Sequence, residues 1–260
     1  MKAYRIHEYG DSAKFIEDEV NKPSAKQGHV VVEVKASSLN PIDHKLLKSD
    51  LGINPALPGI LHMDVSGIIT EMGEGVSDFK TGDEIYGCAG GLQGEAGNIE
   101  GALADFMLAD SNLIALKPKS LSFSESAALP LVTITAWEGL FDRAHIKKED
   151  RVLIHGGTGG VGHIAIQLAR QHGARVATTV SSEDKAKVAR GLGAEDIIFY
   201  RDEKVKDYTQ RLTKGKGFDV VFDTIGADNL DKSLEAAKVS GQVISIIGSN
   251  QHDLTPMHMK

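Results

Sequence analysis

The hydrophobic pattern changes character near residue 120. Before that point, short runs of apolar and β-branched residues recur between turn residues, and Val30–Val34 alternates as a half-buried strand does. After residue 150, apolar runs alternate with segments of helical periodicity, as in a parallel sheet whose strands are joined by helices. The pattern predicts an α/β protein with a β-rich domain at residues 1–121 and a doubly wound parallel sheet at residues 122–260.

Turn residues and capping signals set the expected limits of the elements. Asn40 and Asp43 bracket Pro41 as a capping box at a helix start, and Ser122 with Glu125 predicts a second helix start after the domain boundary. Gly90–Gly101 is predicted to be a loop because it holds five glycines. The predicted strands are Lys2–Ile6, His29–Ala36, Val65–Glu71, Asp83–Tyr86, Ala102–Ala109 and Leu113–Leu116, then stretches near 152–155, 175–180, 196–199, 219–223 and 242–247.

The stretch from Val152 to Ala169 predicts a strand, a tight glycine turn and a helix, with Gly173 as the C-cap. Gly157, Gly159 and Gly162 in this turn match the GxGxxG spacing. In that motif the first glycine permits the turn, the second lets a diphosphate approach the backbone, and the third allows close packing. The helix N-terminus would stabilise the diphosphate of a dinucleotide. The residues expected at this site are Gly156, Gly157, Thr158, Gly159, Gly160, Val161 and Gly162.

Two other interpretations of the same turn differ in how well they fit the sequence. An ordinary glycine-rich connection between strand and helix has the same composition. A nucleotide-binding P-loop does not fit, because that motif requires lysine and then serine or threonine after its last glycine, where this chain has His163 and Ile164.

Composition and charge exclude several classes of protein. The 260 residues are 41% hydrophobic and 25% charged, which is typical of a globular protein. A net charge of −7 argues against nucleic acid as a partner, because phosphates require a basic face. The single cysteine, Cys88, excludes a zinc site built on several thiolates within the chain. No apolar run suggests a signal peptide or a membrane span, so we expect a cytoplasmic protein that does not associate with membranes.

Several motifs in one order resemble the medium-chain dehydrogenase/reductase superfamily, and within it the zinc-free quinone oxidoreductase branch. The motifs are Asn40-Pro41-Ile42-Asp43, Asp64-Val65-Ser66-Gly67, Gly82 to Gly87, Ala128-Leu129-Pro130, Thr135-Ala136-Trp137 and the glycine turn. The resemblance implies a GroES-like N-terminal substrate domain, a Rossmann dinucleotide-binding domain, and hydride transfer to a quinone or an α,β-unsaturated carbonyl.

The resemblance also implies that no metal is used. Zinc-dependent members have a cysteine where Asn40 stands and a histidine where Met63 stands. His62 is one residue away from that second position and faces the other side of an extended segment. Without a Lewis acid, an electrophile activated by its own conjugation is the accessible substrate. Asn40 and Thr135 are the expected contacts to substrate or nicotinamide, although helix capping alone also explains Asn40, and the sequence identifies no proton donor.

The end of the second strand of the parallel sheet indicates which cofactor is bound. An acidic residue there would bind the adenosine ribose of NAD, but this chain has Ser181 and Ser182. By resemblance, Lys185 and Tyr200 are spaced to bind the 2′-phosphate of NADPH, with Ser181 as a further donor. Lys185 could equally be one more solvated helix lysine. Gly226, Gly248 and Ser249 are expected beside the nicotinamide at the strand ends.

The sequence is compatible with three functions. The first is an NADPH-dependent quinone or enone reductase acting on a small molecule. The second is a nicotinamide-nucleotide-binding protein without catalysis, and the third is another doubly wound enzyme such as a methyltransferase. Members of the family continue beyond the fifth strand of the sheet, so we expect the chain to be truncated at its C-terminal end, lacking the last strand. A homodimer formed through that strand would be weakened.

Overall fold

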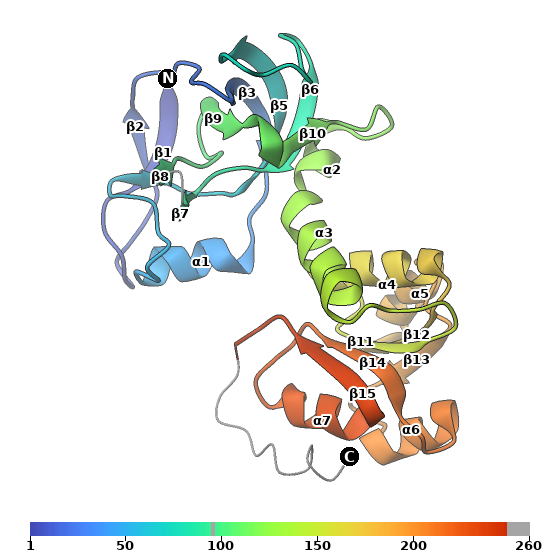
Figure 1. Ribbon diagram of the computed structural model, residues 1–260. Coiled ribbons are helices and arrows are strands. Elements are labelled where there is room, and N and C mark those ends of the chain that lie inside the picture. The colour runs from blue at the N-terminus through green and yellow to red at the C-terminus, as the bar shows by residue number, and fades with distance from the viewer. Residues whose placement is uncertain (95–96, 249–260) are drawn as a thin grey trace. The chain divides into compact units, whose positions relative to one another are not determined.

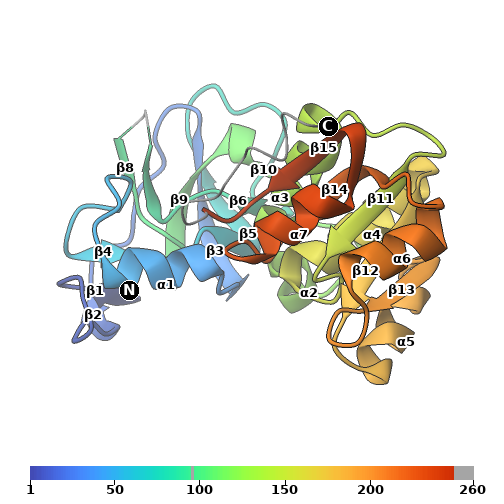
Figure 2. The same cartoon turned by 90° about the horizontal axis from the view of Figure 1, so that it is seen from below.

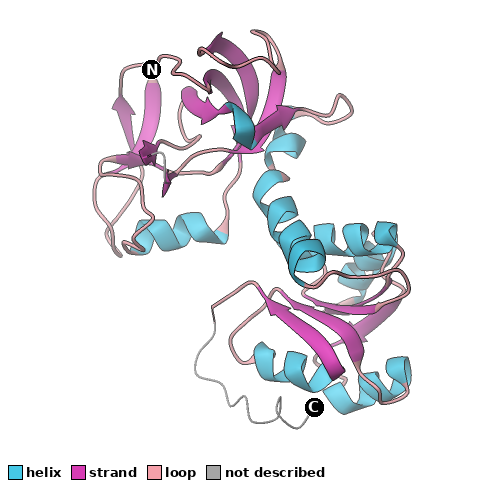
Figure 3. Cartoon of the chain, in the orientation of Figure 1, coloured by secondary structure: helices cyan, strands magenta, loops and turns pink. Residues whose placement is uncertain are grey.

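A computed structural model of the protein describes residues 1–94 and 97–248 (Figure 1). The chain forms two compact units, residues 1–131 and 132–260. Unit 1 consists mainly of strands, whereas strands and helices alternate in unit 2 (Figure 3). The mixed α/β fold predicted from the hydrophobic pattern is confirmed.

Unit 1 is built on antiparallel sheets. A five-stranded sheet has the order β10-β6-β5-β3-β9, and a three-stranded sheet has the order β2-β1-β4. The strands of the first sheet are β3 (His29–Ser37), β5 (Asp64–Met72), β6 (Glu84–Cys88), β9 (Phe106–Asp110) and β10 (Ile114–Leu116). Those of the second are β1 (Lys2–Ile6), β2 (Ile16–Glu19) and β4 (Gly59–Ile60). Alternate residues of β3 and β5 face a core that contains Val30, Val32, Val65 and Ile69.

The helices of unit 1 begin where the capping signals predict. Helix α1 (Pro41–Lys48) and helix α2 (Phe123–Ala127) each start at a capping box, formed by Asn40 with Asp43 and by Ser122 with Glu125. Helix α2 packs against β3, β5 and β6 and therefore belongs to unit 1. The compact unit thus extends past residue 121. The assignment of residues 1–121 and 122–260 to substrate and dinucleotide-binding domains stays a prediction.

Several elements of unit 1 differ from the prediction. Strand β2 was not predicted because its residues Ile16–Glu19 are mostly acidic and exposed, and its pairing with β1 supplies the order. The predicted loop at 90–101 contains a hairpin of β7 (Leu92–Gly94) and β8 (Gly97–Ile99). Strand β9 begins at Phe106 rather than at residue 102, and a short 3₁₀ helix, η1 (Ser111–Leu113), separates it from β10.

Unit 2 contains a parallel sheet of five described strands in the order β13-β12-β11-β14-β15. The strands are β11 (Arg151–His155), β12 (Arg175–Val180), β13 (Asp196–Phe199), β14 (Phe218–Asp223) and β15 (Ala237–Ser245). This order is that of a doubly wound, Rossmann-type sheet. Strand β15 starts five residues before the predicted position. Its first residues include the polar Lys238 and Ser240, so they carry no apolar run that would predict a strand. The pairing of β14 with β15 also has a register shift between Phe218 and Val220.

Helices cover both faces of this sheet (Figures 1 and 2). Because strand residues alternate, Val152 and Ile154 pack with helices α4 (Gly160–His172) and α5 (Glu183–Gly191), whereas Leu153 packs with helices α6 (Val205–Thr213) and α7 (Asn229–Ala236). The apolar runs read in the sequence therefore form strands buried on both faces. Helix α4 ends at Gly173, whose φ of 95° confirms the predicted C-cap.

Helix α3 (Pro130–Trp137) begins in the last residues of unit 1 and continues into unit 2, where it runs into a π-helix, η2 (Glu138–Arg143). Ala136 and Leu140 on this segment are fully buried in the core that contains α4. Leu140 of the π-helical turn is thus part of the core that covers one face of the sheet.

Candidate functional sites

The register of the parallel strands brings the predicted dinucleotide residues of unit 2 to one edge of the sheet. His155 at the end of β11 pairs with Asp223, Asp223 pairs with Ser245, and Val180 pairs with Phe199. Consequently the loops that begin at 156, 181, 200, 224 and 246 leave the sheet side by side. Of the expected residues, Ser249 lies outside the described part of the chain.

The glycine turn is packed so tightly that side chains have no room at two positions. A Cβ atom on Gly157 would lie 2.0 Å from Thr178 Oγ1, and one on Gly162 would lie 2.2 Å from the carbonyl oxygen of Gly156. Gly156 has φ of 75°, a left-handed conformation that favours glycine. Gly159, the N-cap of α4, is exposed and would place its Cβ at 3.2 Å from the Gly156 oxygen. The turn therefore leaves bare backbone at the start of α4.

Asp223, which the sequence did not mark as functional, organises the neighbouring turn. It is fully buried, and its Oδ1 accepts hydrogen bonds from the backbone N–H groups of Ile225 (2.9 Å) and Gly226 (3.1 Å) and from Asn229 Nδ2 (3.0 Å). Its Oδ2 accepts a hydrogen bond from Ser233 Oγ (3.1 Å). One carboxylate thus fixes the loop after β14 and the start of α7, and with them the predicted site residue Gly226.

His155 is buried directly before the glycine turn. Its Nδ1 lies 3.4 Å from Thr179 Oγ1, which also accepts a hydrogen bond from the backbone N–H of Gly156. Burial lowers the pKa of His155 to about 4, against the opposing effect of Asp223. The imidazole is therefore neutral at pH 7 and adds no charge behind the turn.

A pocket of about 840 Å³ opens at this edge of the sheet. Its lining includes Gly156, Tyr200, Arg201, Ile225 and Gly226, which come from the ends of β11, β13 and β14. The pocket lies entirely within unit 2, at the position where doubly wound sheets bind ligands. Its volume is within the range of small-molecule and cofactor sites.

Ser181 and Tyr200 each come directly after a strand end. They follow the paired residues Val180 and Phe199, and the backbone N–H of Tyr200 donates to the Val180 oxygen (3.4 Å). Tyr200 is 48% exposed, and the Arg201 guanidinium lies 5.7 Å from the centre of its ring.

Lys185 is exposed in the first turn of α5, and its ammonium has no ion-pair partner among the described residues. The two acidic side chains beside it are directed elsewhere along the helix. Glu183 pairs with Arg190 (3.7 Å) and Asp184 pairs with Lys187 (3.5 Å). These pairings leave the lysine charge available to an anion.

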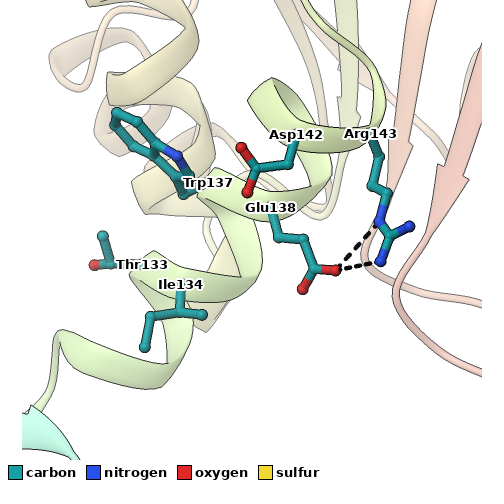
Figure 4. A pocket seen from close by; sticks show the side chains of 6 residues that line it. All are labelled: Thr133, Ile134, Trp137, Glu138, Asp142 and Arg143. Carbon is teal, nitrogen blue, oxygen red and sulfur yellow. Dashed lines mark hydrogen bonds and ion pairs between the residues drawn. The ribbon is translucent and has the colours of Figure 1, made fainter. Parts of the chain in front are cut away.

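The remaining predicted residues of unit 2 differ in their surroundings. Gly226 has φ of 69° and no space for a Cβ, which would lie 2.7 Å from Ile247 Cβ. Gly248 is exposed, and no atom of the described residues other than its chain neighbours lies within 4 Å of a Cβ placed on it. Thr135 is half-buried on α3. It does not line the surface pocket of about 540 Å³ formed by Thr133, Ile134, Trp137, Glu138, Asp142 and Arg143 (Figure 4). There the Glu138–Arg143 ion pair (2.8 Å) joins the two ends of η2.

In unit 1, Asn40 belongs to a buried polar network. Its Nδ2 donates to Asp64 Oδ2 (2.9 Å) and to Ser38 Oγ (3.1 Å), so both amide hydrogens are used. Asp64 also accepts hydrogen bonds from Ser38 Oγ (2.7 Å) and from the backbone N–H of Leu131 (2.9 Å) at the start of α3. Burial raises the pKa of Asp64, and these donors counteract part of that effect. The network fixes the orientation of the Asn40 amide.

A second buried carboxylate extends the network to His62. Asp43 Oδ2 accepts a hydrogen bond from the Asn40 N–H (2.7 Å), and its Oδ1 accepts one from the His62 N–H (3.2 Å). Cys88 is a further neighbour of Asp64, and burial raises the pKa of its thiol to about 12. The thiol is therefore protonated and is not a nucleophile at pH 7. Within residues 1–94 and 97–248, no three His, Cys, Asp or Glu side chains gather as a metal site.

The fold and the glycine turn together define the class of protein. It has two units, and its Rossmann-type unit carries a glycine turn that leaves bare backbone at the start of α4. Comparison with known proteins extends this result. Residues 26–119 match the alcohol dehydrogenase GroES-like domain, and residues 160–260 match the zinc-binding dehydrogenase family. The chain is 36% identical over 253 residues to 2-methylene-furan-3-one reductase of Solanum lycopersicum, covering 96% of the chain and 63% of that enzyme.

Two further similarities concern quinone oxidoreductases. The chain is 31% identical over 247 residues to the quinone oxidoreductase of Rattus norvegicus, covering 95% of the chain and 73% of that protein. The crystal structure of Escherichia coli quinone oxidoreductase complexed with NADPH matches with a TM-score of 0.85 at 28% identity, covering all of this chain and 78% of that one. The chain belongs to the medium-chain dehydrogenase/reductase superfamily and is quinone oxidoreductase-like, as the sequence motifs predicted.

Proposed function

We propose that the protein is an NADPH-dependent oxidoreductase that reduces quinones or α,β-unsaturated carbonyl compounds by hydride transfer. The observation that carries this proposal is the bare glycine turn at the carboxyl edge of the parallel sheet, where Gly157 and Gly162 leave no room for a side chain. The similarities to an enone reductase and to quinone oxidoreductases support the substrate class.

The residues present fit NADPH. The backbone from Gly156 to Gly162 and the N-terminus of α4 would hold its diphosphate, since free N–H groups and the helix dipole favour an anion there. Ser181, Lys185 and Tyr200 would hold the 2′-phosphate with two hydroxyl donors and one cation. Gly226, Gly248 and Ser249 would lie beside the nicotinamide, which supplies the hydride when the cofactor is bound.

The protein's own contribution is mainly binding and orientation. Asp223 fixes the loop that carries Gly226, and Asp64 fixes the Asn40 amide, so both candidate contacts are held before any ligand arrives. The positions at which zinc-dependent relatives carry their ligands hold Asn40 and Met63, so we propose chemistry without a metal, on substrates activated by conjugation. Asn40 and Thr135 are kept as proposed contacts to the substrate or the nicotinamide.

The Lys185→Ala variant tests the choice of cofactor. Loss of a charged hydrogen bond of about 1.5–3 kcal/mol would raise the KM for NADPH roughly 10- to 100-fold and leave the KM for NADH unchanged. Lys187→Ala is the matched control, because Lys187 lies on the same helix and pairs with Asp184. Steady-state kinetics with a small quinone and both nucleotides measure the effect. A preference for NADH that Lys185→Ala does not alter would contradict the proposal, and NADPH binding without turnover of any quinone or enone would favour a purely binding role.

The cellular location and the oligomeric state of the protein are predictions. Among the described residues, no helix is both long and apolar enough to span a bilayer. A cytoplasmic location can be tested by cell fractionation. A homodimer can be tested by light scattering during size-exclusion chromatography.

A further inference from the structure

His62 holds a backbone conformation that a histidine rarely adopts. Its φ is 71°, in the left-handed region, where a residue other than glycine, asparagine or aspartate is strained by roughly 1–2 kcal/mol. The surroundings enforce this conformation. The His62 N–H donates to Asp43, its carbonyl accepts from the Ala102 N–H (2.8 Å), and Gly101 packs directly against it. Strain held this firmly is typical of a functional position.

The imidazole is fixed at one nitrogen only. Nδ1 lies 3.0 Å from Ser37 Oγ, and the ring of Phe15 packs edge-on at 6.2 Å between centres. Nε2 has no hydrogen-bond partner among the described residues. It is also not one of their fully buried polar atoms that lack a partner. In the protonated ring both nitrogens carry a proton, so Nδ1–H donates to Ser37 Oγ, and the N–H at Nε2 is the one without a partner among the described residues. When the ring is neutral, the Ser37 hydroxyl can donate to Nδ1 instead.

Two carboxylates, Asp43 on α1 and Asp64 on β5, are the charged groups that act on this ring. Burial lowers the pKa of His62, and both carboxylates oppose that effect. The same carboxylates hold Asn40, Asp43 through its backbone and Asp64 through its side chain. His62 and the proposed substrate contact thus belong to one rigid network within unit 1.

We propose that His62 donates the proton that completes the reduction of an α,β-unsaturated carbonyl compound. The inference rests on the proposed function. When hydride adds to the β-carbon, the electrons of the C=C bond move toward the carbonyl and form an enolate. The Nε2–H bond of the imidazolium then breaks as a C–H bond forms at the α-carbon. The neutral imidazole regains a proton from water, so the ring is unchanged after each turnover.

Quinone reduction can be compared with enone reduction, because the two reactions differ in their need for a proton donor. Hydride addition to a quinone leaves its negative charge on a phenolic oxygen, which water protonates rapidly. Protonation of the carbon of an enolate is slower and benefits from a positioned acid, which contributes typically 10²–10⁴-fold. Loss of His62 should therefore affect enone reduction selectively.

The test uses His62→Asn, because asparagine tolerates a left-handed backbone but cannot act as the acid. We expect kcat with an enone to fall about 100-fold and kcat with a quinone to change by less than about threefold. In the wild type, kcat with the enone should decrease as the pH rises above the pKa of His62, and the variant should lose this dependence. His44→Asn, a change of an exposed histidine on α1, is the matched control, and the melting temperature of each variant verifies folding.

The outcomes separate the two proposals. Equal losses with both substrates would show a structural role, and unchanged enone turnover would show no role. Either result overturns the inference while quinone turnover by the wild type upholds the proposed function. A wild type that reduces neither substrate would overturn both.

Discussion

Replacement of Gly162 by alanine tests the packing of the glycine turn. The new Cβ would lie 2.2 Å from the Gly156 oxygen, an atom of the backbone that cannot rotate away. That oxygen also accepts the Gly159 N–H (2.9 Å), so moving it breaks a bond of the turn. Overpacking costs about 1–3 kcal/mol and the lost hydrogen bond about 1 kcal/mol, while the better helix propensity of alanine returns about 1 kcal/mol. We expect a net loss of about 1–3 kcal/mol.

Gly159→Ala separates binding from folding. Its Cβ would meet the Gly156 oxygen at 3.2 Å, a small displacement, so we expect stability to fall by about 1 kcal/mol or less. A methyl group at this exposed N-cap would nevertheless occupy the approach of the diphosphate, and we expect NADPH affinity to fall at least about tenfold.

Urea unfolding followed by circular dichroism and titration calorimetry with NADPH measure both quantities. Gly191→Ala, at the end of α5, is the control, because no atom in the described part of the chain, other than its chain neighbours and the helix backbone, lies within 4 Å of the added Cβ. Alanine there should stabilise the protein by up to about 1 kcal/mol. A Gly162→Ala protein as stable as the wild type would refute the packing argument. A Gly159→Ala protein that binds NADPH normally would show that the diphosphate lies elsewhere.

Two more predictions concern the buried groups behind this turn. Because the pKa of His155 is about 4 in the folded protein and near 6.5 when unfolded, the unfolded state binds more protons between these values, so stability should decrease from pH 6.5 toward pH 4 by on the order of 3 kcal/mol. Urea unfolding across this range should show a shallower decrease for His155→Gln. Asp223→Ala should lower the unfolding free energy by about 3 kcal/mol or more, because four donors lose their acceptor, whereas Ser233→Ala should cost only about 1 kcal/mol. Equal losses for the two variants would contradict the central position of Asp223.

What the sequence predicts well is what depends on local chemistry. The strand, glycine turn and helix around Gly157, the C-cap at Gly173 and both capping boxes require only neighbouring residues, and all are confirmed. Strand β2 was missed because its acidic residues carry no hydrophobic alternation, and it is ordered by pairing with β1 and by ion pairs such as Lys2–Glu17 (2.9 Å).

In the candidate site, too, the features that depend on neighbouring residues could be predicted and those that depend on distant residues could not. The glycines could be inferred from the motif, and the placement of Ser181 and Tyr200 directly after neighbouring strand ends could be inferred from spacing. The positions of Asp64, Asp223 and His62 could not, because their hydrogen bonds join residues far apart in the chain, as from Asp64 to Leu131. A strained backbone at His62 leaves no signal in a single sequence, since it depends on the packing of Gly91 and Gly101 around it.

The pairing of β1 has a consequence for synthesis. One edge of β1 pairs at once with β2, but the N–H of Tyr4 donates to Leu103 and the N–H of Lys2 donates to Asp105. The second edge of β1 therefore stays partly open after β4 pairs with Arg5 and Ile6, and it is completed only when the nascent chain reaches about residue 105. During that interval the unpaired part of this edge is open to pairing with a neighbouring chain.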